Sequence, residues 1–346
     1  MGRLNEQRRY LRVRNGRRRN KMATLKDVAR EAGLTVTTVS RVLNNRGYIS
    51  DNARERVAQA MKKLNYRPNE LARSLQNKSS NTLGVIVPHI RHPYFAEMIS
   101  NLENEGHKKG YKILLCNSQG RDEKMLEYVE MCYSNRVAGV ILFSGTVDAS
   151  VFEKMDIPIV TVERYVDAAT ASVECDNIQG GALVAKKLIS LGCKHLLHIG
   201  SFTDTPMPAD SRVVGFRQVC AEYGIPFLEI MTEVVQFDSM NYSEMIEKTL
   251  REHPDIDGLF ANSDVIAAQA LQVCRKLGIS VPDQIKIIGF DDSMIAPITA
   301  PQLTSVHQPI KEMATIAVDL LDKAAAGQLV AKRTVLPVYL VEREST

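Results

Sequence analysis

Five polar side chains within eight positions of the sequence can bond DNA. They are Thr37, Thr38, Ser40, Arg41 and Asn44, and each can contact phosphates or base edges. The guanidinium of Arg41 has the fork geometry that pairs bidentately with O6 and N7 of guanine in the major groove. This segment therefore predicts recognition of nucleic acid.

The sequence lacks the common motifs of catalytic sites. It contains no G-x-S-x-G, no H-E-x-x-H and neither of the glycine-rich phosphate loops G-x-x-x-x-G-K-[ST] and G-x-G-x-x-G. His195 and His198 lie in an apolar run, which favours buried strand histidines over metal ligands. Asp291 and Asp292 are adjacent, so their side chains should point apart and make a poor acid–base pair. We therefore expect that the protein is not an enzyme and that it binds no cofactor and no metal. A hydrolase on the same scaffold is the alternative.

Composition and cysteine placement limit the class of protein. The 346 residues are enough for two to three domains at roughly 150 residues each. No apolar stretch reaches the ~18 residues of a membrane span, and the arginine-rich residues 1–21 lack the apolar core of a secretory signal. Six scattered cysteines argue against a disulfide framework or a zinc knuckle. We therefore expect a cytoplasmic protein with no contact to a membrane.

The net charge of +4 conceals a strong polarity along the chain. Residues 1–81 carry 20 Lys and Arg against 6 Asp and Glu, whereas residues 82–346 carry 24 against 34. A basic head on an acidic body is typical of a protein that meets nucleic acid with one end only. A pair of solvated, charged helices is the alternative interpretation.

Three short helices are predicted to position the polar segment. Thr24, with Asp27 three residues later, resembles a capping box, and Gly33 supplies the turn that ends the first helix. The second helix carries the polar segment on one side and valines on the other. Ser50 caps the third helix. Three such helices with a glycine-bearing turn between the first two are typical of a helix-turn-helix domain.

The rest of the chain alternates short apolar runs with amphipathic helical stretches. Continuous Val, Ile and Leu strands between helices predict parallel sheets that are covered on both faces. About 265 residues of this pattern predict two α/β lobes, with ligands at the carboxyl ends of the strands. The runs are TLGVIVP (82–88), YKILLCNS (111–118), GVILFS (139–144), PIVTV (158–162), HLLHIGS (195–201), GLFANS (258–263) and IKIIGFD (285–291).

Two motifs identify a family. VSRVLN occupies residues 39–44, and NYRPN-x-LARSL occupies residues 65–75. With them, the stretch from Ala23 to Gln76 closely resembles, without a gap, the DNA-binding headpiece of the lac-repressor (LacI/GalR) family of bacterial transcription regulators. The pair is far more specific than a helix-turn-helix pattern alone. The remainder resembles the family's effector domain, which has the two-lobed fold of the periplasmic sugar-binding proteins.

The resemblance implies a division of the chain into four segments. Residues 1–21 are a basic tail that we expect to be disordered, and Met22 looks like a natural start, which favours translated upstream sequence over a DNA-binding arm. Residues 22–68 form the helix-turn-helix domain, 69–81 the hinge helix and linker, and 82–346 the domain for effector binding and dimerisation. We expect lobe 1 at 82–192 and 306–328, and lobe 2 at 193–305 and 329–346, with three crossings between them.

The family's docking geometry implies roles for particular residues on DNA. Its second helix enters the major groove, which would bring Thr35, Val36, Thr37 and Arg41 to the DNA. Val36 offers only apolar contact, most naturally to a thymine methyl, while Thr35 and Asn44 would hold phosphates and set the register. Paired headpieces of a homodimer would match the half-sites of a near-palindromic operator.

The hinge segment from Asn69 to Gln76 is too short for a helix that is stable alone in water, where ~12–15 residues are marginal. The resemblance implies that it folds against its dimer mate in the minor groove. Asn69 would contact DNA, and Leu75 would be the wedge that kinks the duplex. Alternatively, Leu71 and Leu75 form a packing stripe.

The resemblance also implies an effector site between the lobes. Arg212 and Asp291 would hold adjacent hydroxyls of a polyol, since one offers paired donors and the other paired acceptors. The aromatic rings of Tyr94 and Phe95 would provide an apolar wall against the ligand. For each residue a helix cap or a surface group is the alternative. The implied site residues are Tyr94, Phe95, Asp176, Arg212, Ser263, Asp291 and Gln308.

Together these observations predict a homodimeric, ligand-responsive transcription regulator, most simply the repressor of a carbohydrate-utilisation operon. Its effector would be a sugar or a sugar phosphate, acting as inducer or corepressor. Control by a phosphorylated partner protein, as in the family's global catabolite regulators, is an alternative. A free-standing sugar-binding protein is another, although it would have no use for residues 22–76.

Overall fold

The structure is a computed structural model that describes all residues except 1–22, 45–46, 67–79, 144–156 and 202–205. It divides into two compact units, Met1–Gln76 and Asn77–Thr346, each of which is considered by itself. Within the described residues, no helix is long and apolar enough to cross a membrane. The expectations for residues 1–21 and for the hinge, including Asn69 and Leu75, fall outside the described residues.

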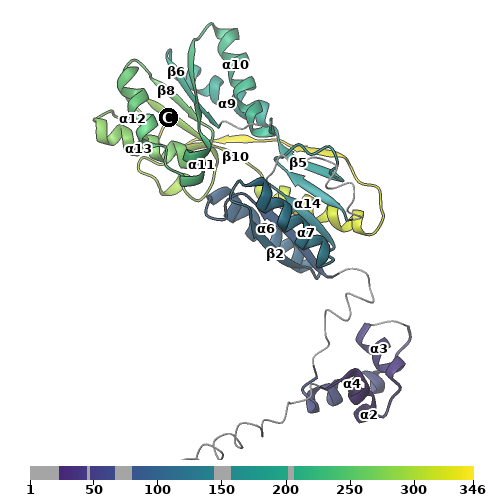
Figure 1. The fold of residues 1–346 in the computed structure, drawn as a ribbon. Helices are drawn as coiled ribbons and strands as arrows, with labels where there is room; N and C mark the ends of the chain where they lie inside the picture. Colours follow the sequence, from purple (N-terminus) through teal and green to yellow (C-terminus); the bar gives the residue numbers. More distant parts are fainter. Residues whose placement is uncertain (1–22, 45–46, 67–79, 144–156, 202–205) are drawn as a thin grey trace, which may run out of the picture. The chain divides into compact units, whose positions relative to one another are not determined.

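The described residues of the N-terminal unit form the three predicted helices α2 (Leu25–Ala32), α3 (Val36–Asn44) and α4 (Asp51–Lys63) (Figure 1). The capping box at Thr24 and the left-handed Gly33, with φ of 60°, are both confirmed. Ser50 caps α4 by accepting a hydrogen bond from the backbone of Ala53. The core of this unit is made of small apolar side chains, namely Val28, Ala29, Ala32, Val39, Val57 and Ala60.

Lobe 1 of the C-terminal unit is built on a parallel sheet in the order β11-β5-β4-β3-β1-β2. Alternate β1 residues pack toward opposite faces, because Val85 belongs to the cluster under α6 and α14 while Ile86 belongs to the cluster under α7. The elements are β1 (Thr82–Val87), α6 (Pro93–Lys108), β2 (Lys112–Asn117), α7 (Asp122–Ser134), β3 (Gly139–Leu142), β4 (Ile159–Val162), β5 (Ala171–Cys175), α14 (Ile310–Ala325) and β11 (Arg333–Leu336).

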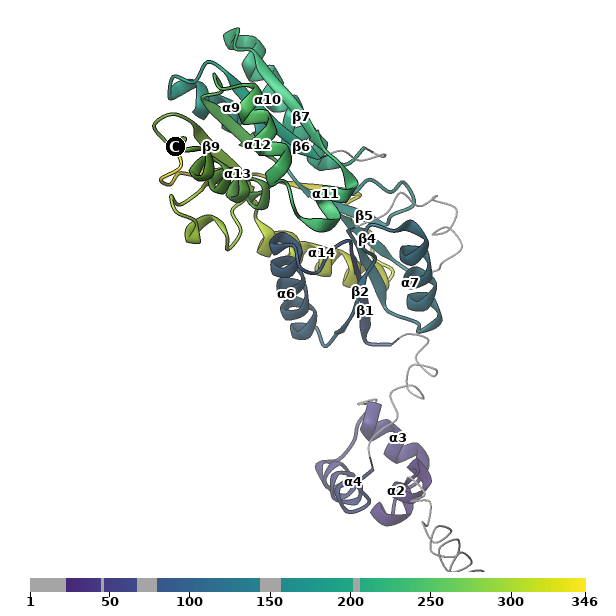
Figure 2. The same ribbon diagram turned by 60° about the vertical axis from the view of Figure 1, so that its left-hand side comes forward.

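Lobe 2 has a second six-stranded sheet, in the order β12-β10-β9-β8-β6-β7, which is parallel except for the antiparallel pair β10 and β12. Helices α9 and α10 cover one face, and α12 and α13 cover the other (Figure 2). The elements are α9 (Asn177–Ser190), β6 (Leu196–Ser201), α10 (Ser211–Tyr223), β7 (Phe227–Thr232), α11 (Val234–Ser239), α12 (Ser243–Glu252), β8 (Gly258–Ala261), α13 (Asp264–Leu277), β9 (Lys286–Asp291), β10 (Thr304–His307) and β12 (Tyr339–Val341), with short 3-10 turns at Pro208–Asp210 and Ala296–Ile298. The predicted pair of α/β lobes with parallel sheets is confirmed.

The predicted lobe boundaries are wrong in two places. The expected range 82–192 puts α9 in lobe 1, whereas α9 packs on α10 in lobe 2. The expected range 329–346 puts β11 in lobe 2, whereas β11 pairs with β5 at the edge of the lobe 1 sheet. β11 is a short, partly exposed edge strand without an apolar pattern. Helix α9 buries a face made of Gly180, Gly181, Val184, Ala185 and Leu188, a pattern that predicts burial but does not reveal which lobe the helix packs on.

The chain passes between the two sheets after β5, after β10 and after β11. The carboxyl ends of β4 and β9, from different lobes, therefore lie near the first two of these crossings. Because parallel strands direct their carboxyl ends to one edge of a sheet, the residues that follow them can form a shared site between the lobes.

Two glycines allow α9 and α10 to cross in backbone contact. A Cβ atom at Gly181 would lie 1.8 Å from the carbonyl oxygen of Arg212, and one at Gly215 would lie 1.8 Å from the carbonyl oxygen of Ile178. Both obstacles are backbone atoms, which cannot move aside as a side chain can. The crossing therefore brings the first turns of α9 and α10 as close as glycine alone permits.

We predict that Gly215→Ala destabilises the C-terminal unit by about 1–3 kcal/mol or more, the usual range for overpacking. Thermal and urea unfolding measure this change. Gly106→Ala is the matched control, because a Cβ atom at this helical glycine meets its nearest neighbour at an ordinary 3.5 Å. Equal stability of the two variants would contradict the close crossing.

Candidate functional site

The exposed face of α3 carries the side chains predicted to meet DNA. Val36 is 40% exposed, and Thr35, Thr37 and Arg41 are exposed as well. Val39, on the opposite side, is fully buried in the core of the N-terminal unit. The helix therefore turns one side to the core and leaves the predicted contact side free for a partner.

Local contacts fix the start of α3. The Thr35 hydroxyl accepts a hydrogen bond from the backbone N–H of Thr38 at 3.1 Å, so Thr35 caps the helix. The Arg56 guanidinium of α4 donates to the carbonyl of Gly33 at 3.2 Å and holds the turn between α2 and α3. Asn44 ends α3, but its side chain is outside the described residues.

A chain of hydrogen bonds links the two lobes at the centre of the C-terminal unit. Glu163 follows β4, and its Oε2 accepts from Nδ2 of Asn177 at 2.9 Å. Oδ1 of Asn177, at the start of α9, accepts from Nε of Arg212 at 2.8 Å. Arg212 Nη1 donates to the carbonyl of Asn262, after β8, at 2.6 Å. The close crossing of α9 and α10 is what brings Asn177 and Arg212 within reach of each other.

Arg212 is only 6% exposed and is surrounded by compensating groups. Its guanidinium lies 3.6 Å from the ring centre of Phe290, a cation–π contact. Asp291, the next residue, is 4% exposed and has φ of 111°, a backbone conformation that L-residues rarely adopt. Strain of this kind at a strand end is typical of a functional site.

Two acidic residues of this site have raised pKa values. Burial raises the pKa of Asp291, and the neighbouring Asp264 raises it further, while Arg212 opposes both. Burial also raises the pKa of Glu163, against the lowering effect of Arg212. Oδ1 of Asp291 accepts a hydrogen bond from Nε2 of Gln308 at 2.7 Å.

Three buried polar atoms near this site have no hydrogen-bond partner among the described residues. They are the Tyr94 hydroxyl, Oε1 of Gln308 and Nδ1 of His92. Burial lowers the pKa of His92 to about 4, with further lowering by His89 and Arg212, so its ring is neutral near pH 7. Leaving such atoms without partners costs stability, which makes the position suited to a polar ligand.

The predicted site residues divide into two groups. One group, buried at the centre, consists of Tyr94, Arg212, Asp291 and Gln308. Burial raises the pKa of the Tyr94 hydroxyl, Glu163 and Asp291 raise it further, and Arg212 lowers it. We call Tyr94, Glu163, Asn177, Arg212, Asp291 and Gln308 the central cluster.

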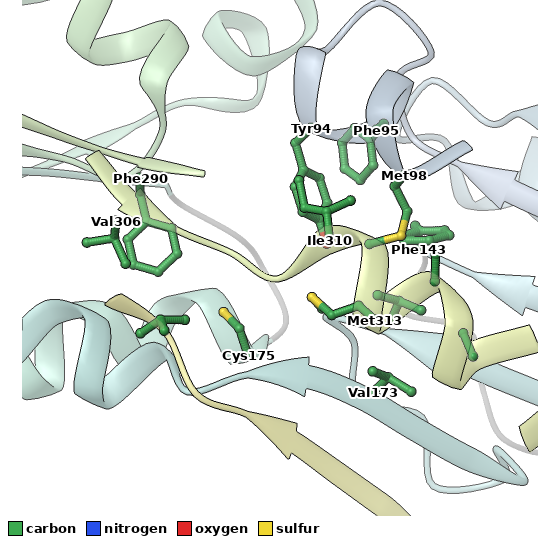
Figure 3. Close-up of a cluster of buried hydrophobic side chains, with 14 of the residues drawn as sticks. Tyr94, Phe95, Met98, Phe143, Val173, Cys175, Phe290, Val306, Ile310 and Met313 are labelled. Carbon is green, nitrogen blue, oxygen red and sulfur yellow. The ribbon is translucent and has the colours of Figure 1, made fainter. Parts of the chain in front are cut away.

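The other three predicted residues have structural contacts. Phe95 packs in the core of lobe 1, in edge contact with Phe143 at 6.0 Å (Figure 3). Asp176 caps α9 by accepting from the backbone of Gln179, and Ser263 caps α13 by accepting from Ile266. For Asp176 and Ser263, the alternative interpretation as helix caps therefore accounts for the hydrogen bonds of their side chains.

The sequence prediction missed Glu163 and Asn177. Glu163 directly follows the apolar run PIVTV, so a carboxylate at a strand end was the available indication. Asn177 adjoins the predicted Asp176, and only the crossing of α9 and α10 distinguishes the two side chains. Among the described residues, no three His, Cys, Asp or Glu side chains gather in a way that could hold a metal ion.

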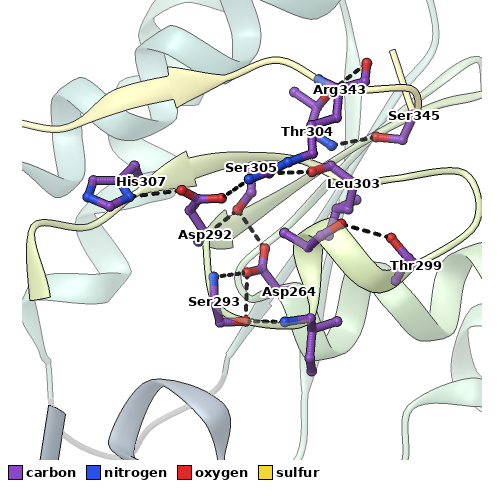
Figure 4. A network of polar contacts seen from close by, with 12 residues as sticks. Asp264, Asp292, Ser293, Thr299, Leu303, Thr304, Ser305, His307, Arg343 and Ser345 are labelled. Atoms are coloured by element: carbon purple, nitrogen blue, oxygen red, sulfur yellow. Dashed lines mark hydrogen bonds and ion pairs between the residues drawn. The ribbon is translucent and has the colours of Figure 1, made fainter. Parts of the chain in front are cut away.

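A polar network supports the loop that follows β9 (Figure 4). The buried Asp264 accepts from the backbone and hydroxyl of Ser293, at 2.7 and 2.9 Å, and from the hydroxyl of Ser305 at 2.5 Å. Asp292 instead bonds Arg343 at 2.6 Å and His307 at 2.9 Å. Asp291 and Asp292 therefore serve different partners, and the network holds the strained strand end in place.

Comparison with known proteins identifies both units. Residues 24–69 match the model of bacterial regulatory proteins of the lacI family, and residues 185–346 match that of a periplasmic binding protein-like domain. A sucrose operon repressor of Streptococcus mutans is 38% identical over 324 residues, which cover 94% of this chain and 99% of that protein. A ribose operon repressor of Halalkalibacterium halodurans is 37% identical over 328 residues, with 94% and 97% covered.

A solved structure is also similar. The crystal structure of a periplasmic binding protein/LacI transcriptional regulator from Alkaliphilus metalliredigens, complexed with D-xylulofuranose, is 31% identical with a TM-score of 0.69. It covers 77% of this chain, which spans 99% of that structure. With two operon repressors among the relatives, the prediction of a regulator in place of an enzyme is confirmed. The chain belongs to the lacI family of bacterial regulatory proteins.

Proposed function

We propose that this protein is the cytoplasmic repressor of a carbohydrate-utilisation operon and that a small sugar, bound at the central cluster, controls its affinity for operator DNA. The observation that carries the proposal is the central cluster itself, where a buried arginine and two buried carboxylates lie beside unpartnered polar atoms of Tyr94 and Gln308. Sucrose and ribose operon repressors among the relatives, and a similar structure with a bound ketopentose, support a sugar.

The chemistry of the cluster suits a polyol. Asp291 and Glu163 offer acceptors to hydroxyl protons, while Arg212 and the Tyr94 hydroxyl offer donors to hydroxyl oxygens. The Phe290 ring packs against the flat face of the Arg212 guanidinium and helps to hold it in position. A ligand in this place touches residues of both lobes and therefore favours one arrangement of the lobes over others.

On DNA, α3 would lie in the major groove with Arg41 on a guanine and Val36 on a thymine methyl. Thr37 would contact a base or a methyl, and Thr35 and Asn44 would contact phosphates. One headpiece contacts too few base pairs for selectivity, so we infer a homodimer on a near-palindromic operator. Asn69 and Leu75 of the hinge would add the minor-groove contacts.

We predict that Arg41→Ala removes selectivity for the operator and leaves weak, salt-sensitive binding to any duplex. The bidentate contact to guanine contributes about 1–3 kcal/mol per half-site, and a symmetric dimer loses it twice. Fluorescence anisotropy on operator and scrambled duplexes at one salt concentration measures the difference. Arg30→Ala, which removes an exposed arginine paired with Asp27 on α2, should keep the selectivity. Equal losses on both duplexes would assign Arg41 to a phosphate.

We predict that Asp291→Asn weakens sugar binding at least about tenfold, because the amide has one acceptor oxygen fewer and a buried hydroxyl left without a partner costs about 1–3 kcal/mol. Asparagine keeps the volume and tolerates the left-handed backbone of this position. Calorimetry with a panel that includes sucrose, D-ribose and D-xylulose measures the change. The variant should bind operator normally in the absence of sugar and lose its response to sugar.

Asp255→Asn is the matched control, because Asp255 is an exposed carboxylate of lobe 2 that lies outside both the central cluster and the network around Asp292. It should retain the sugar affinity of the natural protein. Full sugar affinity in Asp291→Asn would remove Asp291 from the site.

A further inference from the structure

A cavity of about 600 Å³ lies beside α11 and is lined mainly by basic and amide side chains. His89 and Arg91 come from the segment after β1, and Asn117 and Arg121 come from the end of β2 and the segment before α7. Asp238 of α11 is the contribution of lobe 2. The described residues that line this cavity include no member of the central cluster.

The charges in this cavity favour an anion. Arg91 and Arg121 are exposed at its surface and bring two guanidinium groups to one side of it. Arg121 donates to Oε1 of Gln119, a neutral acceptor that orients the guanidinium without removing its charge. The opposing carboxylate of Asp238 is engaged by Nε2 of His89 at 3.0 Å.

The buried amide of Asn117 can add a hydrogen-bond donor for a ligand. Oδ1 of Asn117 is buried and finds no hydrogen-bond partner in the described part of the chain, and rotation of this amide would present its NH₂ group to an anion. Helix α7 begins directly after Arg121 without a side-chain cap, and the carboxylates of Asp122 and Glu123 in its first turn already offset the positive end of the helix. The attraction for an anion therefore comes from the two arginines.

We propose that this cavity is a second ligand site, which takes a phosphate group from inorganic phosphate or from a phosphorylated small metabolite. Paired guanidinium groups match the geometry of phosphate oxygens. The ligand would lie between the loops of lobe 1 and Asp238 of lobe 2, where its negative charge and that of the carboxylate repel each other. The site is independent of the proposed sugar site and does not require it.

Calorimetric titration of the full-length protein with inorganic phosphate tests the proposal. The double variant Arg91→Ala/Arg121→Ala should bind phosphate at least about tenfold more weakly, since it loses charge-assisted hydrogen bonds. Both side chains are exposed, so thermal unfolding without phosphate should be unchanged. Arg136→Ala is the matched control, because Arg136 is an exposed arginine of the same lobe at the far end of α7.

A second variant should change the affinity in the opposite direction. Asp238→Asn removes the opposing charge and keeps a hydrogen-bond acceptor for His89, so it should bind phosphate more tightly than the natural protein. Hexose 6-phosphates should bind more tightly than phosphate if a metabolite is the ligand, and no better if inorganic phosphate is. Absence of phosphate binding to the natural protein, equal affinity in the double variant, or an equal loss in Arg136→Ala would overturn the proposal.

Discussion

One buried cation organises the centre of the C-terminal unit. A guanidinium as buried as that of Arg212 is stable only with acceptors in direct reach. Asn177 and the carbonyl of Asn262 accept its N–H groups, and Phe290 covers its flat face. These partners stand on α9, after β8 and on β9, so the compensation of a single charge fixes three elements relative to one another. The glycine crossing of α9 and α10 is a condition for this arrangement, because a Cβ atom at either glycine would separate the two helix starts.

In the smaller N-terminal unit, a few particular contacts determine how α3 is oriented. The fully buried side chains of this unit are small, and larger apolar side chains such as Leu25, Met61 and Leu64 pack around them, so particular anchors contribute to the orientation of α3. Val39 fixes the rotation of the helix about its axis, and the bond from Arg56 to Gly33 fixes its start. The consequence is an exposed face that presents Val36, Thr37 and Arg41, while Thr35 also caps the helix and bonds the hydroxyl of Thr38. A recognition surface needs this separation, since groups used within the fold are not available to DNA.

The sequence predicted most of the fold because its patterns are strong where burial is complete. Continuous apolar runs identified the central strands, and caps at Thr24 and Ser50 identified helix starts. An edge strand such as β11 carries no such pattern, and the apolar face of α9 shows that the helix is buried but not on which lobe, so two lobe boundaries were misplaced. The site was predicted less completely. Arg212 and Asp291 were predicted from the family resemblance. An oxygen at a helix start serves equally as a cap or as a ligand contact, so only coordinates separate Asp176 and Ser263, which cap helices, from Asn177, which bonds Arg212.

The unpartnered atoms of the central cluster connect ligand binding to the arrangement of the lobes. Tyr94 belongs to lobe 1, while Gln308 lies at a crossing beside the lobe 2 residue Asp291. A buried polar group without a partner costs about 1–3 kcal/mol, and a ligand hydroxyl that bonds it removes this cost only while the lobes hold it in reach. Coupling between two sites in a regulator is typically 1–3 kcal/mol. One or two such groups are therefore sufficient in magnitude for a sugar to shift the equilibrium between lobe arrangements, and no larger rearrangement of the core is required.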